Sequence, residues 1–189
     1  QLKMDGTQFD IAFSTTPADD RTEPLLTIDG QQVNETGLDK IAFQIAPNPG
    51  EAMKPLAGIA SGGELSRVVL ALKALLAQKE SVETVVFDEV DAGIGGETAE
   101  IVGKKLHDLS GYHQLICITH LSQIAKFGAH HYKIEKKVKD GRTTTEITPL
   151  PEKERVKEIA RMSGGEKITE KTLAHAEEML KQGKQFHRG

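Results

Sequence analysis

Residues 84–120 read TVVFDEVDAGIGGETAEIVGKKLHDLSGYHQLICITH, and this stretch decides the fold of the chain. It opens with a β-branched and aromatic run at 84–87, continues with a helical pattern at 97–109, and closes with a second apolar run at 114–119. Strands and helices that alternate in this way form parallel sheets, because parallel strands need a long crossover between them. The stretch therefore predicts an α/β fold in which helices bury both faces of two apolar strands.

The strongest helical pattern lies just before this stretch. Residues 64–79 carry apolar side chains three and four positions apart, which predicts a helix with one apolar face: Leu65, Val68, Val69, Leu72, Leu75 and Leu76. The predicted core is thus a helix followed by a strand, a helix and a strand.

Antiparallel β structure is expected on either side of this core. The predicted strands are an opening layer at 7–13 and 40–45 and a later hairpin at 132–138 and 143–150. Turn signals lie between the members of each pair, at Asp29-Gly30 and Asp140-Gly141. Two polar helices follow the hairpin. We therefore expect one domain with three regions: β-rich 1–50, the core at 51–128, and the hairpin and C-terminal helices at 129–189.

Composition limits the possible classes of function. The chain has 189 residues, 38% of them hydrophobic, which is enough for a substantial core. We expect an intracellular protein, because no apolar run approaches the roughly 20 residues that cross a bilayer and Cys117 has no cysteine partner. A net charge of -4 argues against a surface that binds DNA throughout. The absence of Trp and the 4% aromatic content disfavour a base-stacking platform.

A glycine-rich string directly precedes the predicted helix. Ser61-Gly62-Gly63-Glu64 would place two glycines and a small hydroxyl at the helix N-terminus. There the first N–H groups lack internal partners, the helix dipole adds positive potential, and glycines let a phosphate approach the backbone. The string is therefore a candidate anion site. The alternative is that Ser61 only caps the helix, and the string alone does not decide between the two.

Polar residues also follow both predicted strands of the core. Asp88 and Glu89 come after the first strand, and His120 ends the second. Ligands of open α/β sheets bind beyond the carboxyl ends of the strands. There Asp88 would hold Mg²⁺ and Glu89 would accept a proton from the water that attacks a phosphate. The alternative is that these polar groups only solvate strand ends. Cys117 is expected to be a small core residue, and the other histidines to be structural or at the surface.

The order of these features resembles an ABC ATPase. Ser61-Gly62-Gly63-Glu64, Asp88-Glu89, Asp91 and His120 follow one another as signature motif, Walker B with catalytic Glu, D-loop and switch histidine. Within that class the sequence resembles the RecN family of bacterial DNA double-strand-break repair ATPases, which is related to the structural maintenance of chromosomes (SMC) proteins. The resemblance spans about residues 40–125, and a weaker similarity is found at 159–162. The residues that carry it are Lys54-Pro55-Leu56 and the stretches 59–67, 87–96 and 119–125.

The resemblance implies contacts with a second head. Ser61 and the amides of Gly62 and Gly63 would bind the γ-phosphate of an ATP held by the opposite head, and Glu64 would belong to the same nucleotide-binding motif. Asp91 would lie at the head-to-head contact. Transporter ATPases usually carry Gln where Glu64 stands, which favours the chromosome-repair branch.

The resemblance also implies roles within the chain's own head. Asp88 would serve Mg²⁺, Glu89 would be the general base, and His120 would bond the γ-phosphate of ATP. Lys54 and Arg67 are weaker candidates for contacts with nucleotide or between lobes, and the alternative for each is a solvated cation.

One ATPase element is missing from the 189 residues: there is no phosphate loop of the form G-x-x-x-x-G-K-[ST]. The family carries that loop at its N-terminus, before a long coiled coil. The resemblance thus implies a C-terminal head lobe that is nearly inactive alone. Its partners would be the N-terminal Walker A lobe, a second head in an ATP-dependent homodimer, and DNA through the full-length protein, in the bacterial cytoplasm and with no membrane contact.

Three further interpretations belong to the same motifs. A second string, Ser163-Gly164-Gly165-Glu166, follows the Walker B and histidine motifs, so we expect it to be a turn between helices. A transporter nucleotide-binding lobe and a non-catalytic dimerisation module remain as alternatives to the repair ATPase. The intact Asp88-Glu89 pair and His120 argue against a non-catalytic module.

Overall fold

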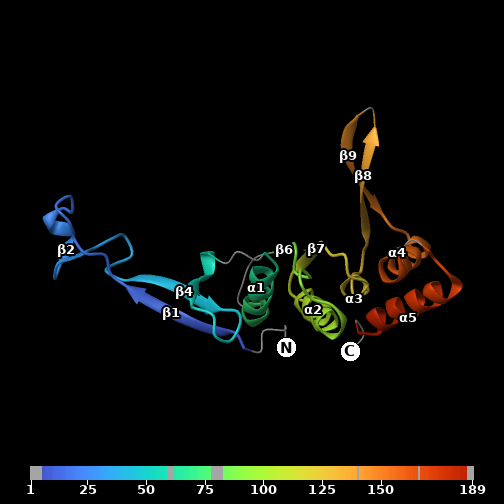
Figure 1. Cartoon of the computed structure of the whole chain (residues 1–189), viewed down its shortest axis with the longest axis horizontal. Helices are drawn as coiled ribbons and strands as arrows, with labels where there is room; N and C mark the ends of the chain where they lie inside the picture. Colours follow the sequence, from blue (N-terminus) through green and yellow to red (C-terminus); the bar gives the residue numbers. More distant parts are fainter. Residues whose placement is uncertain (1–5, 59–61, 78–82, 140, 166, 187–189) are drawn as a thin grey trace. The chain divides into compact units, whose positions relative to one another are not determined.

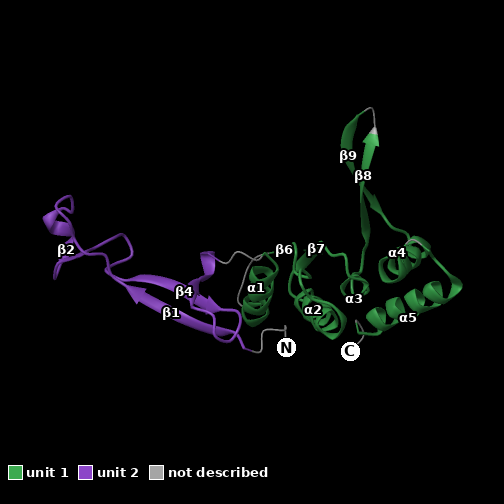
Figure 2. Ribbon diagram, in the orientation of Figure 1, with its two compact units in different colours: residues 1–3, 62–189 green, residues 4–61 purple. Residues whose placement is uncertain are grey.

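The computed structural model describes residues 6–58, 62–77, 83–139, 141–165 and 167–186, and its helices and strands are labelled in Figure 1. The chain divides into two compact units, residues 4–61 and residues 1–3 with 62–189, which Figure 2 colours separately. None of the described helices combines the length and apolar character needed to cross a membrane.

The unit of residues 4–61 is built on an antiparallel sheet with the strand order β1-β4-β5. β1 (Gln8–Ser14) pairs along its whole length with β4 (Lys40–Ala46), and β5 (Lys54–Pro55) adds a short edge. Because side chains alternate between the faces of a strand, one face carries six apolar residues: Phe9, Ile11, Phe13, Ile41, Phe43 and Ile45. The two strands predicted at 7–13 and 40–45 are therefore confirmed.

A second, smaller hairpin lies between β1 and β4 in the chain. Its strands are β2 (Thr27–Ile28) and β3 (Gln31–Gln32), and a short 3-10 helix, η1 (Pro24–Leu26), precedes them. A second 3-10 helix, η2 (Leu56–Gly58), follows β5. Asp29 and Gly30 turn the hairpin with φ angles of 49° and 74°. Two consecutive positive φ angles are what a tight hairpin turn requires, so the turn signal was correct.

The α/β core lies in the unit of residues 62–189. Its elements are α1 (Gly62–Leu76), β6 (Thr84–Phe87), α2 (Gly96–Leu109), β7 (Gln114–Cys117) and α3 (Ser122–Ala125). β6 and β7 pair in parallel, with Phe87 opposite Cys117. The predicted helix, strand, helix and strand are confirmed.

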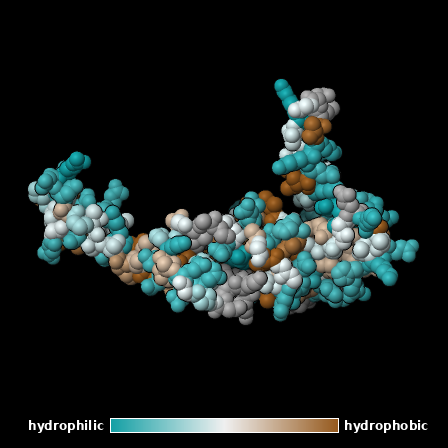
Figure 3. Space-filling model, viewed as in Figure 1, coloured by the Kyte–Doolittle hydropathy of each residue, from teal (hydrophilic) through white to brown (hydrophobic). Residues whose placement is uncertain are grey.

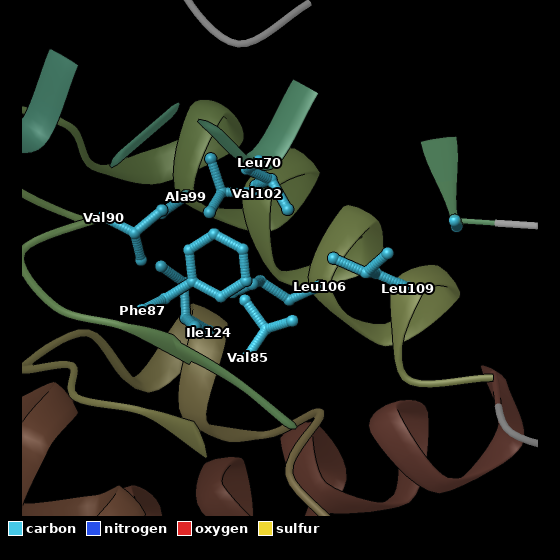
Figure 4. Packing of buried hydrophobic residues seen from close by; sticks show 10 residues of the cluster. Leu70, Val85, Phe87, Val90, Ala99, Val102, Leu106, Leu109 and Ile124 are labelled. Atoms are coloured by element: carbon cyan, nitrogen blue, oxygen red, sulfur yellow. The ribbon is translucent and has the colours of Figure 1, made fainter. Parts of the chain in front are cut away.

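Phe87 is at the centre of this core. Figure 4 shows its ring among Leu70 of α1, Val102 of α2 and Val90 of the loop after β6, all of them fully buried. Each such side chain contributes roughly 1.5–3 kcal/mol when it leaves water. The core therefore fixes the carboxyl end of β6 against both helices.

Two expectations about burial were wrong. The strands are covered on one face only, because alternation places Val86 and Ile116 on a face to which no described helix is packed; they are 59% and 49% exposed. On α1 the buried side is also shifted from the predicted stripe: Leu70 is fully buried, whereas Leu75 is 81% exposed. α1 packs on the core with the side that carries Leu70, which leaves part of its apolar face uncovered.

The chain continues into the predicted hairpin and helices. β8 (Tyr132–Lys139) and β9 (Arg142–Pro149) pair antiparallel, and Figure 3 shows hydrophobic side chains on the hairpin surface. α4 (Glu152–Gly164) and α5 (Glu170–Phe186) then pack on each other around Ile159 and Ala176. Gly165 ends α4 with a φ of 78° and donates its N–H to the Arg161 carbonyl, so the described part of the second glycine string forms the end of this helix, as a glycine turn would; Glu166 lies outside the described residues.

A buried arginine holds the base of the hairpin to α4. Arg155 donates from its guanidinium to the carbonyl oxygens of Gly128 (2.8 Å) and Ala129 (3.1 Å). His131 donates from Nε2 to the Ala125 carbonyl 2.8 Å away, and its burial and the Arg155 charge lower its pKa. His131 is thus a structural residue, as the sequence interpretation expected.

Candidate functional site

The candidate site is a pocket at the carboxyl ends of β6 and β7. It is lined by two turns of chain that follow these strands: Asp88, Glu89, Asp91, Ile118, Thr119 and His120. The two strands end at the same edge because they run parallel, and the Ile118 N–H extends the pairing by donating to the Phe87 carbonyl at 2.9 Å. The acids and the histidine predicted from the sequence are therefore neighbours.

Asp91 is the buried acid of the pocket, and its carboxylate has several polar contacts. It is only 4% exposed, and its Oδ2 accepts two hydrogen bonds, from the Thr119 hydroxyl at 2.5 Å and from the His120 backbone N–H at 2.9 Å. The same oxygen lies 2.9 Å from the Nδ1 atom of the His120 ring. Because a carboxylate is only an acceptor, this contact favours a proton on Nδ1 and leaves Nε2 for another partner. The His120 ring itself is 72% exposed.

The place expected for Asp91 at a head-to-head contact stays a prediction, because it concerns a second head. Within the chain, the Asp91 carboxylate contacts and orients His120. The sequence carried little sign of this pairing, because the two residues are 29 positions apart.

Glu89 has an unusual backbone. Its φ is 56°, a left-handed conformation that costs a residue with a side chain of the order of 1–3 kcal/mol. The turn is closed by the Ala92 N–H, which donates to the Glu89 carbonyl at 3.0 Å, and by burial of Val90. The side chains of Asp88 and Glu89 remain exposed. The turn therefore presents two adjacent carboxylates to the solvent side of the pocket.

Asp88 is suited to Mg²⁺ but not to hold it alone. No group of three or more His, Cys, Asp or Glu side chains that could hold a metal is found within the described ranges. Mg²⁺ in nucleotide sites takes one or two carboxylates together with substrate phosphates and water. An exposed aspartate at a strand end fits that pattern.

The glycines of the signature motif contact the same turn. A Cβ on Gly62 would lie 2.3 Å from Glu89 Oε2, and a Cβ on Gly63 would lie 2.7 Å from the Ala92 Cβ. At Gly63 there is no room for a side chain, because the Ala92 and Glu89 carbonyls also lie within 3.1 Å, whereas at Gly62 a Cβ would displace only the end of the Glu89 side chain. The N-terminus of α1 is thus packed on the turn that carries Glu89. Ser61 lies outside the described residues, and Glu64 is half-buried.

Two residues of α1 complete this contact. The Ser66 hydroxyl donates to the Asp88 carbonyl at 2.7 Å, and Arg67 Nη1 donates to the Ala92 carbonyl at 2.8 Å. Arg67 is only 7% exposed; burial lowers the pKa of its guanidinium, and the nearby Glu64 opposes that shift. Sequence reasoning missed Ser66, and the described Arg67 is not a solvated cation. Lys54 is exposed on β5 of the other unit.

Cys117 takes no part in the chemistry of the pocket. Burial, followed by the charges of Asp91 and Asp88, raises the pKa of its thiol to about 12. The thiol is therefore protonated at neutral pH and is not a nucleophile. Its side chain packs against the core cluster, as the sequence predicted.

Known proteins with similar sequences are DNA repair proteins. The chain is 44% identical over 186 residues to DNA repair protein RecN of Bacillus subtilis, covering 97% of this chain and 32% of that protein. It is 42% identical over 180 residues to RecN of Haemophilus influenzae and 44% identical over 180 residues to RecN of Vibrio cholerae, with 95% of this chain and 30% of the relative covered in each case. The chain thus spans about a third of the length of these curated relatives. No protein-family model matches it.

Solved structures give a weaker likeness. A chain from a study titled "Structural biochemistry of ATP-driven dimerization and DNA stimulated activation of SMC ATPases" superposes with a TM-score of 0.41 at 19% identity, covering 66% of this chain and 73% of that one. The SMC head domain from Thermotoga maritima gives 0.38 at 28% identity, covering 58% and 39%. Because both scores are low, the assignment depends on the sequence relatives. With 41–48% identity to them across most of its length, the chain belongs to the RecN family of DNA repair proteins, as a segment about a third as long as its relatives.

Proposed function

We propose that this chain is the C-terminal lobe of an ATP-hydrolysing head of a RecN-type DNA double-strand-break repair protein. The observation that carries the proposal is the meeting of Asp88, Glu89 and His120 in one pocket beside Gly62 and Gly63. A carboxylate pair and a histidine at the ends of parallel strands are suited to phosphoryl transfer to water. The transporter alternative is not favoured, since the relatives named above are DNA repair proteins.

Three residues of the pocket have a proposed task in ATP hydrolysis. Glu89 accepts a proton from the attacking water, and the turn that exposes its carboxylate keeps it away from the core. His120 contacts the γ-phosphate through Nε2, because Asp91 already occupies Nδ1. Asp88 binds Mg²⁺, which when present would neutralise phosphate charge.

The signature residues Ser61 to Glu64 serve the ATP of an opposite head in this proposal. The Glu89 carboxylate lies beside Gly62 at the start of α1, where an anion is favoured by the free N–H groups of the helix. A phosphate from an opposite head would compete for the same place. The Glu89 side chain would then turn toward its own nucleotide.

The remaining partners follow from the missing phosphate loop. The N-terminal Walker A lobe would supply the backbone cradle and the lysine for the β- and γ-phosphates. Two such heads would close on ATP as a homodimer and open after hydrolysis. DNA would be bound through the full-length protein at the bacterial chromosome, in the cytoplasm.

The proposal is tested by combining this chain with the lobe of the full-length protein that carries the phosphate loop, hereafter the reconstituted head. We expect little or no ATP hydrolysis by either part alone and measurable turnover on mixing. Phosphate release is the measurement, and a phosphate-loop lobe with its lysine replaced by alanine is the control. Robust turnover by this chain alone, or none after mixing two folded lobes, would contradict the proposal.

A further inference from the structure

The turn that carries Glu89 is tied to α1 on both of its sides. Ser66 binds the carbonyl of Asp88, which precedes Glu89, and Arg67 binds the carbonyl of Ala92, which follows Asp91. The two bonds are 2.7 Å and 2.8 Å long and come from adjacent residues of one helix. They enclose the segment that supplies Glu89 and Asp91 to the proposed hydrolytic pocket.

Neither carbonyl is in the ladder that joins β6 to β7. The last described bond of that ladder is accepted by Phe87, one residue before Asp88. The carbonyls of Asp88 and Ala92 therefore obtain their partners from α1. The left-handed backbone of Glu89 needs such support, because a strained conformation persists only where its surroundings impose it.

The Arg67 bond is sheltered from water. The residue is 7% exposed and reaches the Ala92 carbonyl across 25 positions of sequence. A buried guanidinium keeps its charge, so loss of this bond would leave a costly unpaired group. Gly63 adds close packing, since Ala92 occupies the space of its missing side chain.

We propose that Ser66 and Arg67 are positioning residues that hold the Glu89–Asp91 turn in its hydrolytic shape. The inference rests on the proposed function and adds a coupling between the ATP sites of the two heads. The start of α1 would contact the ATP of the opposite head, and the next turn of the same helix holds the residues that act on the ATP of its own head. A shift of α1 on head closure is thereby transmitted to Glu89 and, through Asp91, to His120.

Matched control variants are available in the chain. Ser110 also donates its hydroxyl to a backbone carbonyl, that of His107 at 2.6 Å, but at the end of α2. Arg155 is also buried and also donates to two backbone carbonyls, but at the base of the hairpin. Ser110→Ala and Arg155→Met therefore remove the same kinds of bond without touching the turn.

The first test measures amide hydrogen exchange in the 189-residue chain. We expect Ser66→Ala and Arg67→Met to speed exchange at Ala92 and Ile94, whose N–H groups close the turn, by about fivefold or more, the equivalent of losing one hydrogen bond. Arg67→Lys serves as a second variant if Arg67→Met does not fold. The control variants should leave both amides unchanged. Unchanged exchange in Ser66→Ala and in the Arg67 variant would overturn the inference, whether or not the head hydrolyses ATP.

The second test compares kcat with KM in the reconstituted head. We expect Ser66→Ala and Arg67→Met to lower kcat about tenfold while the KM for ATP changes less than about twofold, because misplacing a catalytic group by a fraction of an ångström affects turnover more than binding. Ser66→Thr, which keeps the hydroxyl, should restore kcat. Normal kcat in folded variants, or an equal loss in Arg155→Met, would show that the bonds are only structural. Absence of turnover in the unmodified head would contradict the proposed function instead.

Discussion

The carboxylate of Asp91 and the imidazole of His120 are in direct contact, with Oδ2 and Nδ1 2.9 Å apart. The aspartate is buried and the histidine is exposed, so the fixed partner orients the one that faces solvent. Thr119 strengthens the arrangement by donating to the same oxygen and accepting the Leu121 N–H at 3.1 Å. In the proposed head, this network decides which ring nitrogen of His120 meets a phosphate.

Replacing Asp91 should affect both stability and catalysis. Asp91→Ala leaves the Thr119 hydroxyl and the His120 N–H without their acceptor, so we expect the free energy of unfolding to fall by about 1–3 kcal/mol. Urea unfolding of the chain measures this. Asp108→Asn, which alters an exposed aspartate on α2, is the control and should change little. Unaltered stability of Asp91→Ala would show that water replaces the carboxylate without cost.

Asp91→Asn tests the orientation of the His120 ring separately from the stability of the chain. An asparagine amide can donate to Nδ1 of His120, which would move the ring proton to Nε2. We expect turnover of the reconstituted head to fall at least about tenfold, with a smaller loss of stability than in Asp91→Ala. The nitrogen chemical shifts of the His120 ring report the tautomer. An unchanged tautomer together with full activity would show that Asp91 does not orient His120 for hydrolysis.

Glu89→Gln tests the general base. The substitution keeps the size of the side chain but removes its proton affinity, so hydrolysis by the reconstituted head should slow by about 100-fold or more. ATP-dependent association of heads should remain, as measured by size-exclusion chromatography. Glu97→Gln, at an exposed acid in the first turn of α2, is the matched control. An equal loss of association and turnover would assign Glu89 a structural or metal-binding role.

Gly63→Ala should destabilise the chain without any ligand present. The new Cβ would lie 2.7 Å from the Ala92 Cβ and 3.1 Å from the Glu89 carbonyl, and overpacking of this kind costs about 1–3 kcal/mol. Gly95→Ala, at the N-cap of α2, is the control, since a Cβ there meets nothing within 4 Å. Thermal unfolding compares the two. Equal melting temperatures would mean that the signature glycines are not needed for packing against the turn.

Cys117 should react slowly with thiol reagents in the folded chain. Its pKa is raised to about 12, so at pH 8 nearly all of the thiol is protonated, and only the thiolate is nucleophilic. Unfolding restores an ordinary pKa near 8.5 and should speed alkylation by iodoacetamide at least about 100-fold. Mass spectrometry with and without urea gives the ratio. Rapid alkylation of the folded chain would show that Cys117 is not held in the core.

Local patterns were sufficient for much of the fold. Side-chain alternation, helical spacing and the permissive backbone of glycine all act within a few residues. They predicted the strand at 84–87, the helix before it, and the turns at Asp29-Gly30 and Gly165. Asp88, Glu89 and His120 could also be placed together, because parallel strands end at one edge of a sheet.

Features that depend on distant packing could not be predicted in this way. The exposure of Leu75 and Val86 depends on what covers each face, and the spacing of apolar residues does not specify that. The partner of Ser66 lies 22 positions away, and the partners of the buried Asp91 lie 28 and 29 positions away. A serine within a helix and an aspartate after a strand carry no local sign of such contacts.

Ser61 is the signature residue whose role depends on a second head. It lies outside the described residues, and it directly precedes Gly62 at the start of α1. If it contacts the γ-phosphate held by an opposite head, Ser61→Arg should block ATP-driven dimerisation of the reconstituted head, because a bulky cation would fill the space of the phosphate. Folding should survive, since loss of a helix cap costs only about 0.5–2 kcal/mol. Light scattering with and without ATP measures the dimer.

A mixing experiment distinguishes this role from capping. In the proposed dimer, each ATP site combines the signature motif of one head with the phosphate loop of the other. When a Ser61→Arg head pairs with a head whose phosphate loop is defective, one site carries both defects. The other site carries neither. Mixing two inactive heads should therefore restore part of the ATPase activity. If activity does not return over a range of concentrations, and each mutant alone still dimerises normally with ATP, Ser61 acts as a helix cap and not across the interface.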